Sequence, residues 1–206
     1  MPTSCEEGRL FSAAASGDLD EVKRLVLDCG VDPNIKDKDG KTPLHYAAER
    51  GQLDVVKLLL ERGLDPNIKD DFGNTPLHYA VEGGHLDVVK LLLEHGADPN
   101  VKGGYLGDTP LHRALHNAAS EGHLDVVKLL LEHGADPNVQ DNDGWTPLHY
   151  AAKKCHVDVA RVLLDHGADL TIRDNKGRTP LDIGSECSEE FREMLRRRSG
   201  GTKVYE

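Results

Sequence analysis

Residues 42–74 read TPLHYAAERGQLDVVKLLLERGLDPNIKDDFGN, and close copies of this stretch fill most of the remaining sequence. The TPLH block begins at Thr42, Thr75, Thr109 and Thr146, and a variant TPLD begins at Thr179. Successive starts are 33, 34, 37 and 33 residues apart. A period in this range predicts a repeat array, in which each unit buries its apolar face against its neighbours.

The first half of each unit predicts a short helix. Thr42 is a good N-cap residue, and Pro43 suits the first helical position because the N–H that proline lacks would have no partner there. Small apolar residues follow in the PLHYAA segment, and Gly51 supplies the permissive backbone that ends the helix. We therefore expect a helix that can pack closely against its neighbours.

The second half of each unit predicts a longer helix and a connecting segment. LDVVKLLLERG occupies residues 53–63, with Asp54 in the first turn, where a carboxylate suits the helix dipole, and Gly63 at the end. This helix is apolar on nearly every side, so we expect neighbouring units to cover it on several sides. The remaining LDPNIKDDFGN carries Pro, Asn, Asp and Gly at turn positions, which predicts an extended hairpin or loop.

These blocks resemble those of ankyrin repeats, because TPLHxAA, GHLDVVKLLL, GADPN and DxxGxTP recur in register from Glu7 to Arg198. The resemblance implies an all-α repeat solenoid of about six units, each a helix-turn-helix followed by a β-hairpin or loop. It also implies a right-angled stack with projecting hairpins and a concave face that binds other proteins. It specifies no particular partner.

The spacing divides the chain into six units, of which the first and the last are capping repeats with polar outer faces. The expected boundaries are 7–39, 40–72, 73–106, 107–143, 144–176 and 177–198. Residues 1–6 are expected to form a frayed lead-in and residues 199–206 a mobile tail, because neither stretch continues the periodic pattern.

Composition excludes several classes of function. The formal net charge of −11 repels phosphate backbones, so nucleic-acid binding is not expected, whereas a basic partner surface would be attracted. Aromatic residues make up only 4% of the chain, which argues against a large aromatic-lined ligand cavity and against a bound cofactor. No apolar run reaches 18 residues, so we expect no membrane insertion and a soluble monomer.

The four cysteines show no paired spacing. Cys5, Cys29, Cys155 and Cys187 lie far apart, and no segment resembles a secretory signal. We therefore expect ordinary reduced thiols and a cytoplasmic location, while a nuclear or secreted-effector location stays open.

Three positions depart from the repeated pattern. An Asp lies three residues before the loop glycine at Asp37, Asp70, Asp141 and Asp174. Gly104 takes this place in the loop before Thr109. Residues 113–122, RALHNAASEG, contain four added residues, which can form one extra helical turn, a bulge or an extruded loop. Cys155 occupies the place of Gly51 and Gly84, where a left-handed backbone would cost a non-glycine residue about 1 kcal/mol or more.

Histidine is abundant, but ten of the eleven histidines fall on repeat positions, which indicates a framework role. We expect the TPLH imidazole to bond to the nearby Thr hydroxyl and backbone. His116 is the exception and forms an i, i+4 pair with His112. Such a pair can chelate zinc, but HRALH lacks the Glu of HExxH and no third ligand is evident. A metal-dependent protein that uses residues 112–123 is a distant alternative.

The resemblance places the hairpin tips and the outward side of each first helix on the partner-binding face. Seven residues at such positions are our candidate contacts, namely Phe72, Tyr105, Leu106, Arg113, Trp145, Lys153 and Lys154. Aromatic anchors often dominate binding energy, although each ring can instead lie against its own adjacent hairpin. Tyr46, Tyr79 and Tyr150 follow TPLH regularly, which indicates framework.

The sequence therefore predicts a non-catalytic protein–protein interaction module that binds through its concave face and hairpin tips. No nucleophile elbow, Walker loop or dinucleotide motif is present. A rigid stack loses little ordering entropy when a partner docks. A stoichiometric inhibitor or regulator of a partner enzyme is the main alternative.

Overall fold

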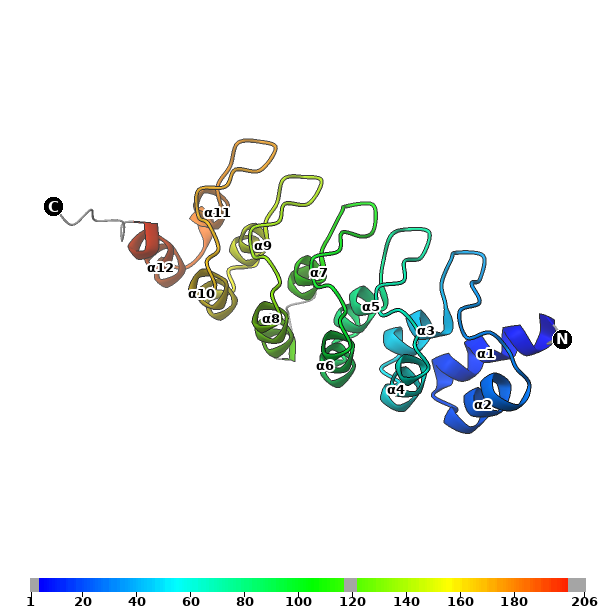
Figure 1. Cartoon of the computed structure of the whole chain (residues 1–206). Coiled ribbons are helices and arrows are strands. Elements are labelled where there is room, and N and C mark those ends of the chain that lie inside the picture. The colour runs from blue at the N-terminus through cyan, green and yellow to red at the C-terminus, as the bar shows by residue number, and fades with distance from the viewer. Residues whose placement is uncertain (1–3, 117–121, 200–206) are drawn as a thin grey trace. The chain divides into compact units, whose positions relative to one another are not determined.

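The computed structural model describes residues 4–116 and 122–199 and divides the chain into two compact units, Met1–Tyr105 and Leu106–Glu206. Each unit is built from helix pairs, with connecting loops that extend away from the helices (Figure 1). Throughout the described residues the structure is mostly helical and contains no β-sheet. The predicted all-α repeat architecture is confirmed.

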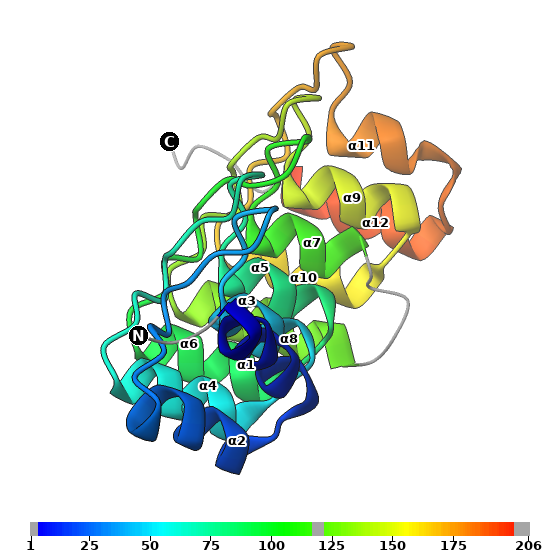
Figure 2. The same ribbon diagram turned by 90° about the vertical axis from the view of Figure 1, so that its right-hand side faces the viewer.

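The first unit stacks its helix pairs in two layers (Figures 1 and 2). The first helices of the pairs form one layer: α1 (Ser4–Ser16), α3 (Pro43–Glu49) and α5 (Pro76–Glu82). The second helices form the other: α2 (Leu19–Lys23), α4 (Leu53–Glu61) and α6 (Leu86–Glu94). A π-helical turn, Arg24–Asp28, continues α2. Because α3 packs against both α1 and α5, the middle repeat is covered on two sides.

The second unit repeats this plan and ends in a shorter pair. Its first helices are α7 (Pro110–His116), α9 (Pro147–Lys154) and α11 (Pro180–Ile183). Its second helices are α8 (Gly122–Glu132), α10 (Val157–Asp165) and α12 (Glu189–Ser199). A 3-10 turn, Gly184–Glu186, follows α11. The last first-layer helix is therefore only four residues long.

The helix boundaries follow the local signals in the sequence. Thr42 is the N-cap of α3 with an extended backbone, Pro43 is the first helical residue, and the same arrangement begins α5 and α9. Gly51 ends the α3 segment with a φ of 70°, a left-handed conformation that glycine adopts without a steric penalty. These predictions are confirmed.

The cores of both units are made of leucine, valine and alanine. In the first unit the fully buried leucines come from every helix pair: Leu10, Leu25, Leu44, Leu59, Leu77 and Leu92. In the second unit the equivalent leucines are fully buried, and so is Phe191 of α12 in the last repeat. Burial of one such side chain contributes about 1.5–3 kcal/mol, so each repeat depends on its neighbours to cover these residues.

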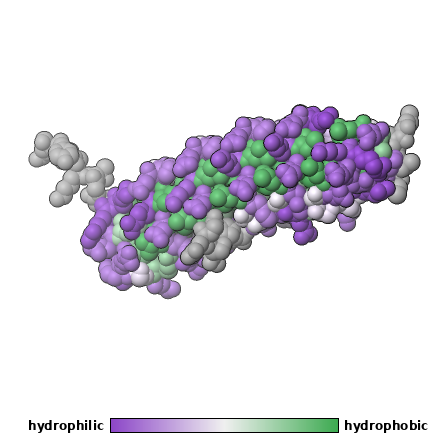
Figure 3. Space-filling view, turned by 90° about the horizontal axis from the view of Figure 1, so that it is seen from below, coloured by the Kyte–Doolittle hydropathy of each residue, from purple (hydrophilic) through white to green (hydrophobic). Residues whose placement is uncertain are grey.

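The second helices are less completely covered than their composition predicts. Val55, Val56 and Leu59 of α4 are buried, but Leu53 at the start of the helix is more than a third exposed, as is Leu86 at the start of α6. Figure 3 views the side on which these helices lie and shows apolar residues between hydrophilic ones. Within residues 4–116 and 122–199, no helix combines the length and apolarity needed to span a bilayer.

The ends and the insertion differ in detail from the expectation. α1 already begins at Ser4, so the last residues of the expected lead-in are helical. The amide of Phe191 donates to Ser188 Oγ at 3.3 Å, so Ser188 caps the last helix. α7 is seven residues long, as is α3. The choice between an extra turn and a loop falls on residues 117–121, which lie outside the described part of the chain, as do residues 200–206.

Candidate functional site

The TPLH histidine joins consecutive repeats. In the first unit the Thr42 amide donates to His45 Nδ1 at 3.0 Å, so Nδ1 is the acceptor and the ring proton is on Nε2. His45 Nε2 lies 3.2 Å from the Asn74 carbonyl oxygen, one repeat further along the chain, and donates to it. The imidazole therefore caps its own helix and holds the next loop.

The second unit repeats this arrangement. His112 Nε2 donates to the Trp145 carbonyl at 3.1 Å, and His149 Nε2 donates to the Arg178 carbonyl at 3.1 Å. Burial lowers the pKa of His149, as it does that of His45 in the first unit, so both rings are neutral near pH 7. The predicted framework role of the TPLH histidines is confirmed.

The same hydrogen bonds argue against His112 and His116 as a zinc-chelating pair. The Thr109 amide donates to His112 Nδ1 at 3.2 Å, so both nitrogens of this buried ring are already engaged. His116 instead lies beside Tyr150, with 4.3 Å between ring centroids, and its Nε2 is 4.0 Å from Asp108. In the part of the chain that the structure describes, no group of three or more metal-ligating side chains is assembled.

Three loop aspartates each pair with the tyrosine that follows the next TPLH block, so each pair joins the loop of one repeat to the first helix of the next. Asp70 Oδ1 accepts from the amides of Phe72 and Asn74, each at 2.9 Å, and its Oδ2 accepts from Tyr79 Oη at 2.6 Å. The pairs Asp37–Tyr46 and Asp141–Tyr150 have the same 2.6 Å hydrogen bond. The tyrosine row is therefore framework, as its regular placement predicted.

These bonds also shift the acidity of the paired groups. The hydrogen bond to Asp37 raises the pKa of Tyr46 to about 12. Burial and the hydrogen bond to Asp141 raise the pKa of Tyr150. The phenols are therefore neutral donors at any physiological pH, and they hold each loop against the first helix.

At one junction between repeats, both partners of this pair are replaced. Gly104 stands where the other loops have Asp, and Arg113, nine residues later, stands where α3, α5 and α9 have Tyr. The sequence shows each replacement separately, but only the observed Asp–Tyr hydrogen bonds explain why the two change together. The loop that contains Tyr105 therefore has glycine at the position where the other loops have this Asp.

Tyr105 on this loop and Phe72 on the preceding loop form an exposed aromatic pair. Tyr105 is 85% exposed and Phe72 is 41% exposed, and their ring centroids are 5.5 Å apart in an edge-to-face arrangement. The backbone supports the pairing, because the Gly104 amide donates to the Phe72 carbonyl at 2.9 Å. Two adjacent loop tips of the first unit therefore present one apolar surface to solvent. We call Phe72 and Tyr105 the aromatic pair.

The second unit places its candidate contacts differently. Leu106 is 42% exposed at a loop tip, and Lys153 and Lys154 are exposed in the last turn of α9. Arg113 is half-buried on α7. These residues come from the loop before α7, from α7 itself and from the end of α9, so they do not form one cluster in the sequence.

Trp145 is not a freely exposed anchor. Its ring is half-buried and lies 4.9 Å from the Tyr150 ring, and the Arg178 guanidinium carbon is 5.8 Å from its centroid. The backbone carbonyl of Trp145 is the acceptor for His112. Much of this residue therefore supports its own repeat, and a contact between Trp145 and a partner stays a prediction.

A shallow pocket opens beside the tyrosine row of the first unit. It has a volume of about 180 Å³ and is lined by Glu49, Tyr79, Glu82 and Gly83. Lys41 bridges this region, with Nζ 3.1 Å from Glu49 and 4.1 Å from the Tyr79 ring centroid. Carboxylates and an aromatic ring together suit a cationic side chain, and Lys41 already shows that chemistry within the repeat.

The expectation that the cysteines are reduced is wrong for two of them. Cys155 and Cys187 form a disulfide within the second unit, while Cys29 is a half-buried free thiol. No motif indicates this pairing, because the two cysteines are separated by 32 positions in the sequence. The left-handed backbone suspected at Cys155 is confirmed by its φ of 56°.

Comparison with known proteins agrees with the repeat geometry. A family model described as "Ankyrin repeats (3 copies)" matches residues 10–103, 104–141 and 115–203. The crystal structure of EF0377, an ankyrin repeat protein, is similar with a TM-score of 0.81 and 31% identity, covering 93% of this chain and 98% of that one.

A second solved structure and a group of shorter matches complete the comparison. A chain from the complex of the predatory endopeptidase Bd0816 of Bdellovibrio bacteriovorus with the immunity protein Bd3460 has a TM-score of 0.75 and 34% identity, covering 91% of this chain and 96% of that one. Ankyrin repeat domain-containing protein 46 of Rattus norvegicus is 50% identical over 46 residues, which is 22% of this chain. The chain spans about a fifth of the length of the curated relatives it matches.

Proposed function

The chain belongs to the ankyrin-repeat family, and on that premise we propose that it binds another protein through its loop tips and the adjacent first helices, without catalysis. Ankyrin repeats are protein–protein interaction modules, so binding is the activity that the family and the fold have in common. The finer assignment, to particular residues of this chain, rests on what its surface presents.

The aromatic pair is the observation that carries the proposal. A side chain as exposed as Tyr105 contributes little to folding, and its ring sits on a loop whose Asp anchor has been replaced by Gly104. Aromatic rings give large contact areas at low entropic cost, and they are enriched among the residues that dominate binding energy. We assign Phe72 and Tyr105 as the anchors, with Leu106, Arg113, Trp145, Lys153 and Lys154 as further contacts.

The charge of the chain supports a partner with a basic surface. The net charge is −11. The pocket in the first unit, which is also the unit of the aromatic pair, is lined by the carboxylates of Glu49 and Glu82. Complementary charge accelerates association and disfavours partners of the same sign. Nucleic acid is excluded from the proposal by the same sign of charge.

A crosslinking experiment tests the aromatic pair directly. A photo-crosslinking amino acid is placed at Tyr105 and, as a control, at Lys57, which is exposed in the second helix layer. We expect a single protein adduct from position 105 and none from position 57, and the adduct identifies the partner. The affinity of that partner is then measured with Tyr105→Ala and Lys57→Ala.

The expected outcome is a loss of about tenfold or more in affinity for Tyr105→Ala, with no change for Lys57→Ala. Both variants should keep the melting temperature of the parent, since neither side chain is buried. Equal affinities for the parent and Tyr105→Ala would reject the aromatic pair as the anchor.

A stoichiometric inhibitor is the second candidate function. The observation that favours it is the likeness to a chain from an endopeptidase–immunity protein complex, at 34% identity over nearly the whole length of both chains. If the captured partner is an enzyme, titration with this chain should abolish its activity at a one-to-one ratio. Full activity in the saturated complex would leave passive binding as the function.

The cytoplasmic location predicted from the sequence stays a prediction. Disulfides are rare in the reducing cytosol and persist in oxidising compartments. The pairing of Cys155 with Cys187 therefore weighs against that location.

A further inference from the structure

Cys155 stands at a position where the other repeats use glycine. It is the C-cap of α9, and among the described residues it is the only non-glycine residue with a positive φ. The equivalent residues of the first unit, Gly51 and Gly84, have φ values of 70° and 69°. A side chain in this conformation is disfavoured, so a compensating interaction of the side chain is expected.

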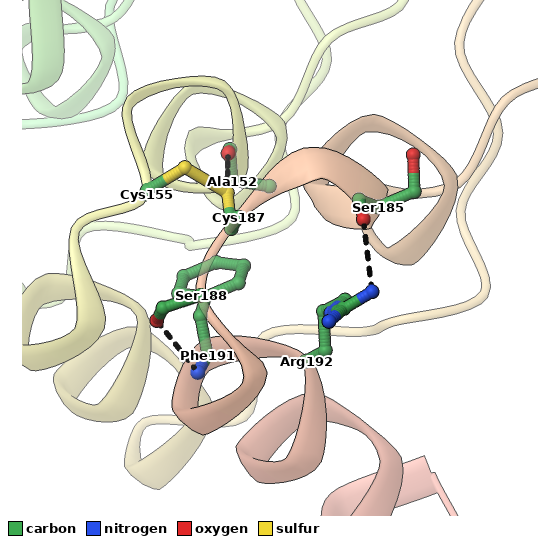
Figure 4. The surroundings of a disulfide bond; sticks show 7 residues. All are labelled: Ala152, Cys155, Ser185, Cys187, Ser188, Phe191 and Arg192. Atoms are coloured by element: carbon green, nitrogen blue, oxygen red, sulfur yellow. Dashed lines mark hydrogen bonds between the residues drawn. A yellow bond between two sulfur atoms is a disulfide. The ribbon is translucent and has the colours of Figure 1, made fainter.

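That interaction is with Cys187, in the segment between the 3-10 turn and α12. The two Cα atoms are 5.5 Å apart, which is in the range that a disulfide requires. Cys155 is exposed, whereas Cys187 is buried. Figure 4 shows the bond between them. The bond therefore fastens the end of α9 to the terminal repeat.

Besides the disulfide, the terminal repeat is attached by the hydrogen bond from His149 Nε2 to the Arg178 carbonyl and by the packing of α11 against α9. Its first helix, α11, has four residues, and its TPLD block puts the exposed Asp182 where other repeats have a buried histidine. Among the residues that the structure describes, no further helix pair packs against its outer side. Its packing depends on Phe191 and Leu195, which α12 buries completely. A terminal repeat with one neighbour is the part of an array that opens most easily.

We propose that Cys155 and Cys187 form a reversible redox clamp, which holds the C-terminal repeat closed when oxidised and lets it open when reduced. The clamp lies at the end of the helix that carries Lys153 and Lys154, but the proposal does not depend on their role in binding. It concerns the stability of α11 and α12 alone.

The chemistry is thiol–disulfide exchange with a low-molecular-weight disulfide as the oxidant. The exposed Cys155 thiolate attacks one sulfur of that disulfide, forms a mixed disulfide and releases one thiolate. The Cys187 thiolate then attacks the Cys155 sulfur and releases the second. Two protein thiols are oxidised, one small disulfide is reduced to two thiols, and the two protein protons end on those thiols.

The reduced state is also accommodated. Cys187 Sγ lies 3.2 Å from the Ala152 carbonyl oxygen, so the reduced thiol can donate a weak hydrogen bond without moving (Figure 4). Reduction then removes the covalent link while the buried sulfur keeps a polar partner. The disulfide can therefore break and re-form without a rearrangement of the core around Phe191.

Hydrogen exchange of the full chain tests the clamp. The protein is equilibrated with oxidised glutathione or with excess dithiothreitol, and amide exchange is followed in α12 and in α4. A disulfide that closes a loop of about 30 residues constrains the open state strongly, so we expect exchange in α12 to become roughly a hundredfold faster on reduction. Exchange in α4, in the first unit, should not change.

Three variants make the result specific. Cys187→Ala should behave in either buffer like the reduced parent. Cys155→Gly also removes the bond but restores the glycine of the other repeats, so its α12 should exchange more slowly than that of Cys187→Ala and should not respond to reductant. Cys29→Ser, which removes the half-buried free thiol, should keep the full response of the parent.

Two results would overturn the proposal. One is alkylation of both Cys155 and Cys187 in the folded protein after equilibration with oxidised glutathione. The other is an oxidised parent whose α12 amides exchange at the same rate after reduction. In the second case the bond forms but does not hold the repeat.

Discussion

The repeat at residues 40–72 and the repeat at residues 144–176 begin with the same TPLHYAA helix and end it differently. Both cap the helix with a histidine that also reaches the next loop. The first of these helices ends at Gly51, which has no side chain. The second ends at Cys155, whose side chain is bonded to the following repeat. The internal repeat therefore depends on packing, whereas the repeat next to the terminal one also has a covalent link to its neighbour.

The repeat that follows each of them explains the difference. After residues 40–72 comes a full helix pair with its own histidine, His78, and a seven-residue first helix. After residues 144–176 comes α11, with four residues and Asp182 in place of the histidine. This shorter neighbour is the one that the disulfide holds.

The largest expected effect comes from removing the histidine itself. His45→Ala leaves the Thr42 amide and the Asn74 carbonyl without their buried partner, and it also leaves a cavity, so we expect a loss of about 3 kcal/mol. Asp182→Ala, at the equivalent place in the exposed terminal repeat, should cost about 0.5 kcal/mol. Urea unfolding of both variants measures the two values, and equal losses would contradict the proposed difference between the repeats.

A smaller effect is expected from exchanging the two helix ends. Gly51→Ala introduces a Cβ that would meet His85 Nδ1 at 2.5 Å, in a backbone conformation that disfavours it, and should cost about 1.5 kcal/mol. In the reduced protein, Cys155→Gly should increase the free energy of unfolding by about 1 kcal/mol, because glycine adopts the left-handed conformation without a steric penalty. Both are measured by denaturant unfolding in dithiothreitol, and a Gly51→Ala protein as stable as its parent would show that the left-handed position is not restrictive.

The smallest effect is expected from the tyrosine hydroxyls. Tyr150→Phe removes the bond to Asp141 in a buried setting and should cost about 1 kcal/mol, whereas Tyr46→Phe removes the bond to Asp37 in a half-buried one and should cost about 0.5 kcal/mol. Thermal unfolding of the two variants gives their order. The reverse order would mean that these bonds stabilise independently of burial.

Much of this could be predicted from the sequence because the signals are local. The capping by Thr42 and His45 spans three residues, and the Asp37–Tyr46 bond spans nine. The role of Trp145 was harder to predict, because its exposure depends on Tyr150 and Arg178 packing around it. Among the candidate contacts, Phe72, Tyr105 and Leu106 are exposed at loop tips and Lys153 and Lys154 are exposed at the end of α9, and binding by any of them stays a prediction.

The sequence by itself determined the repeat, the ends of its helices and the polar framework of each loop, because all of these depend on interactions between residues close along the chain. The tertiary structure alone decided which aromatic rings remain exposed and that Cys155 meets Cys187. Both depend on where one repeat lies against the next, and a side chain's neighbours in space are set by that stacking and not by its place in a motif.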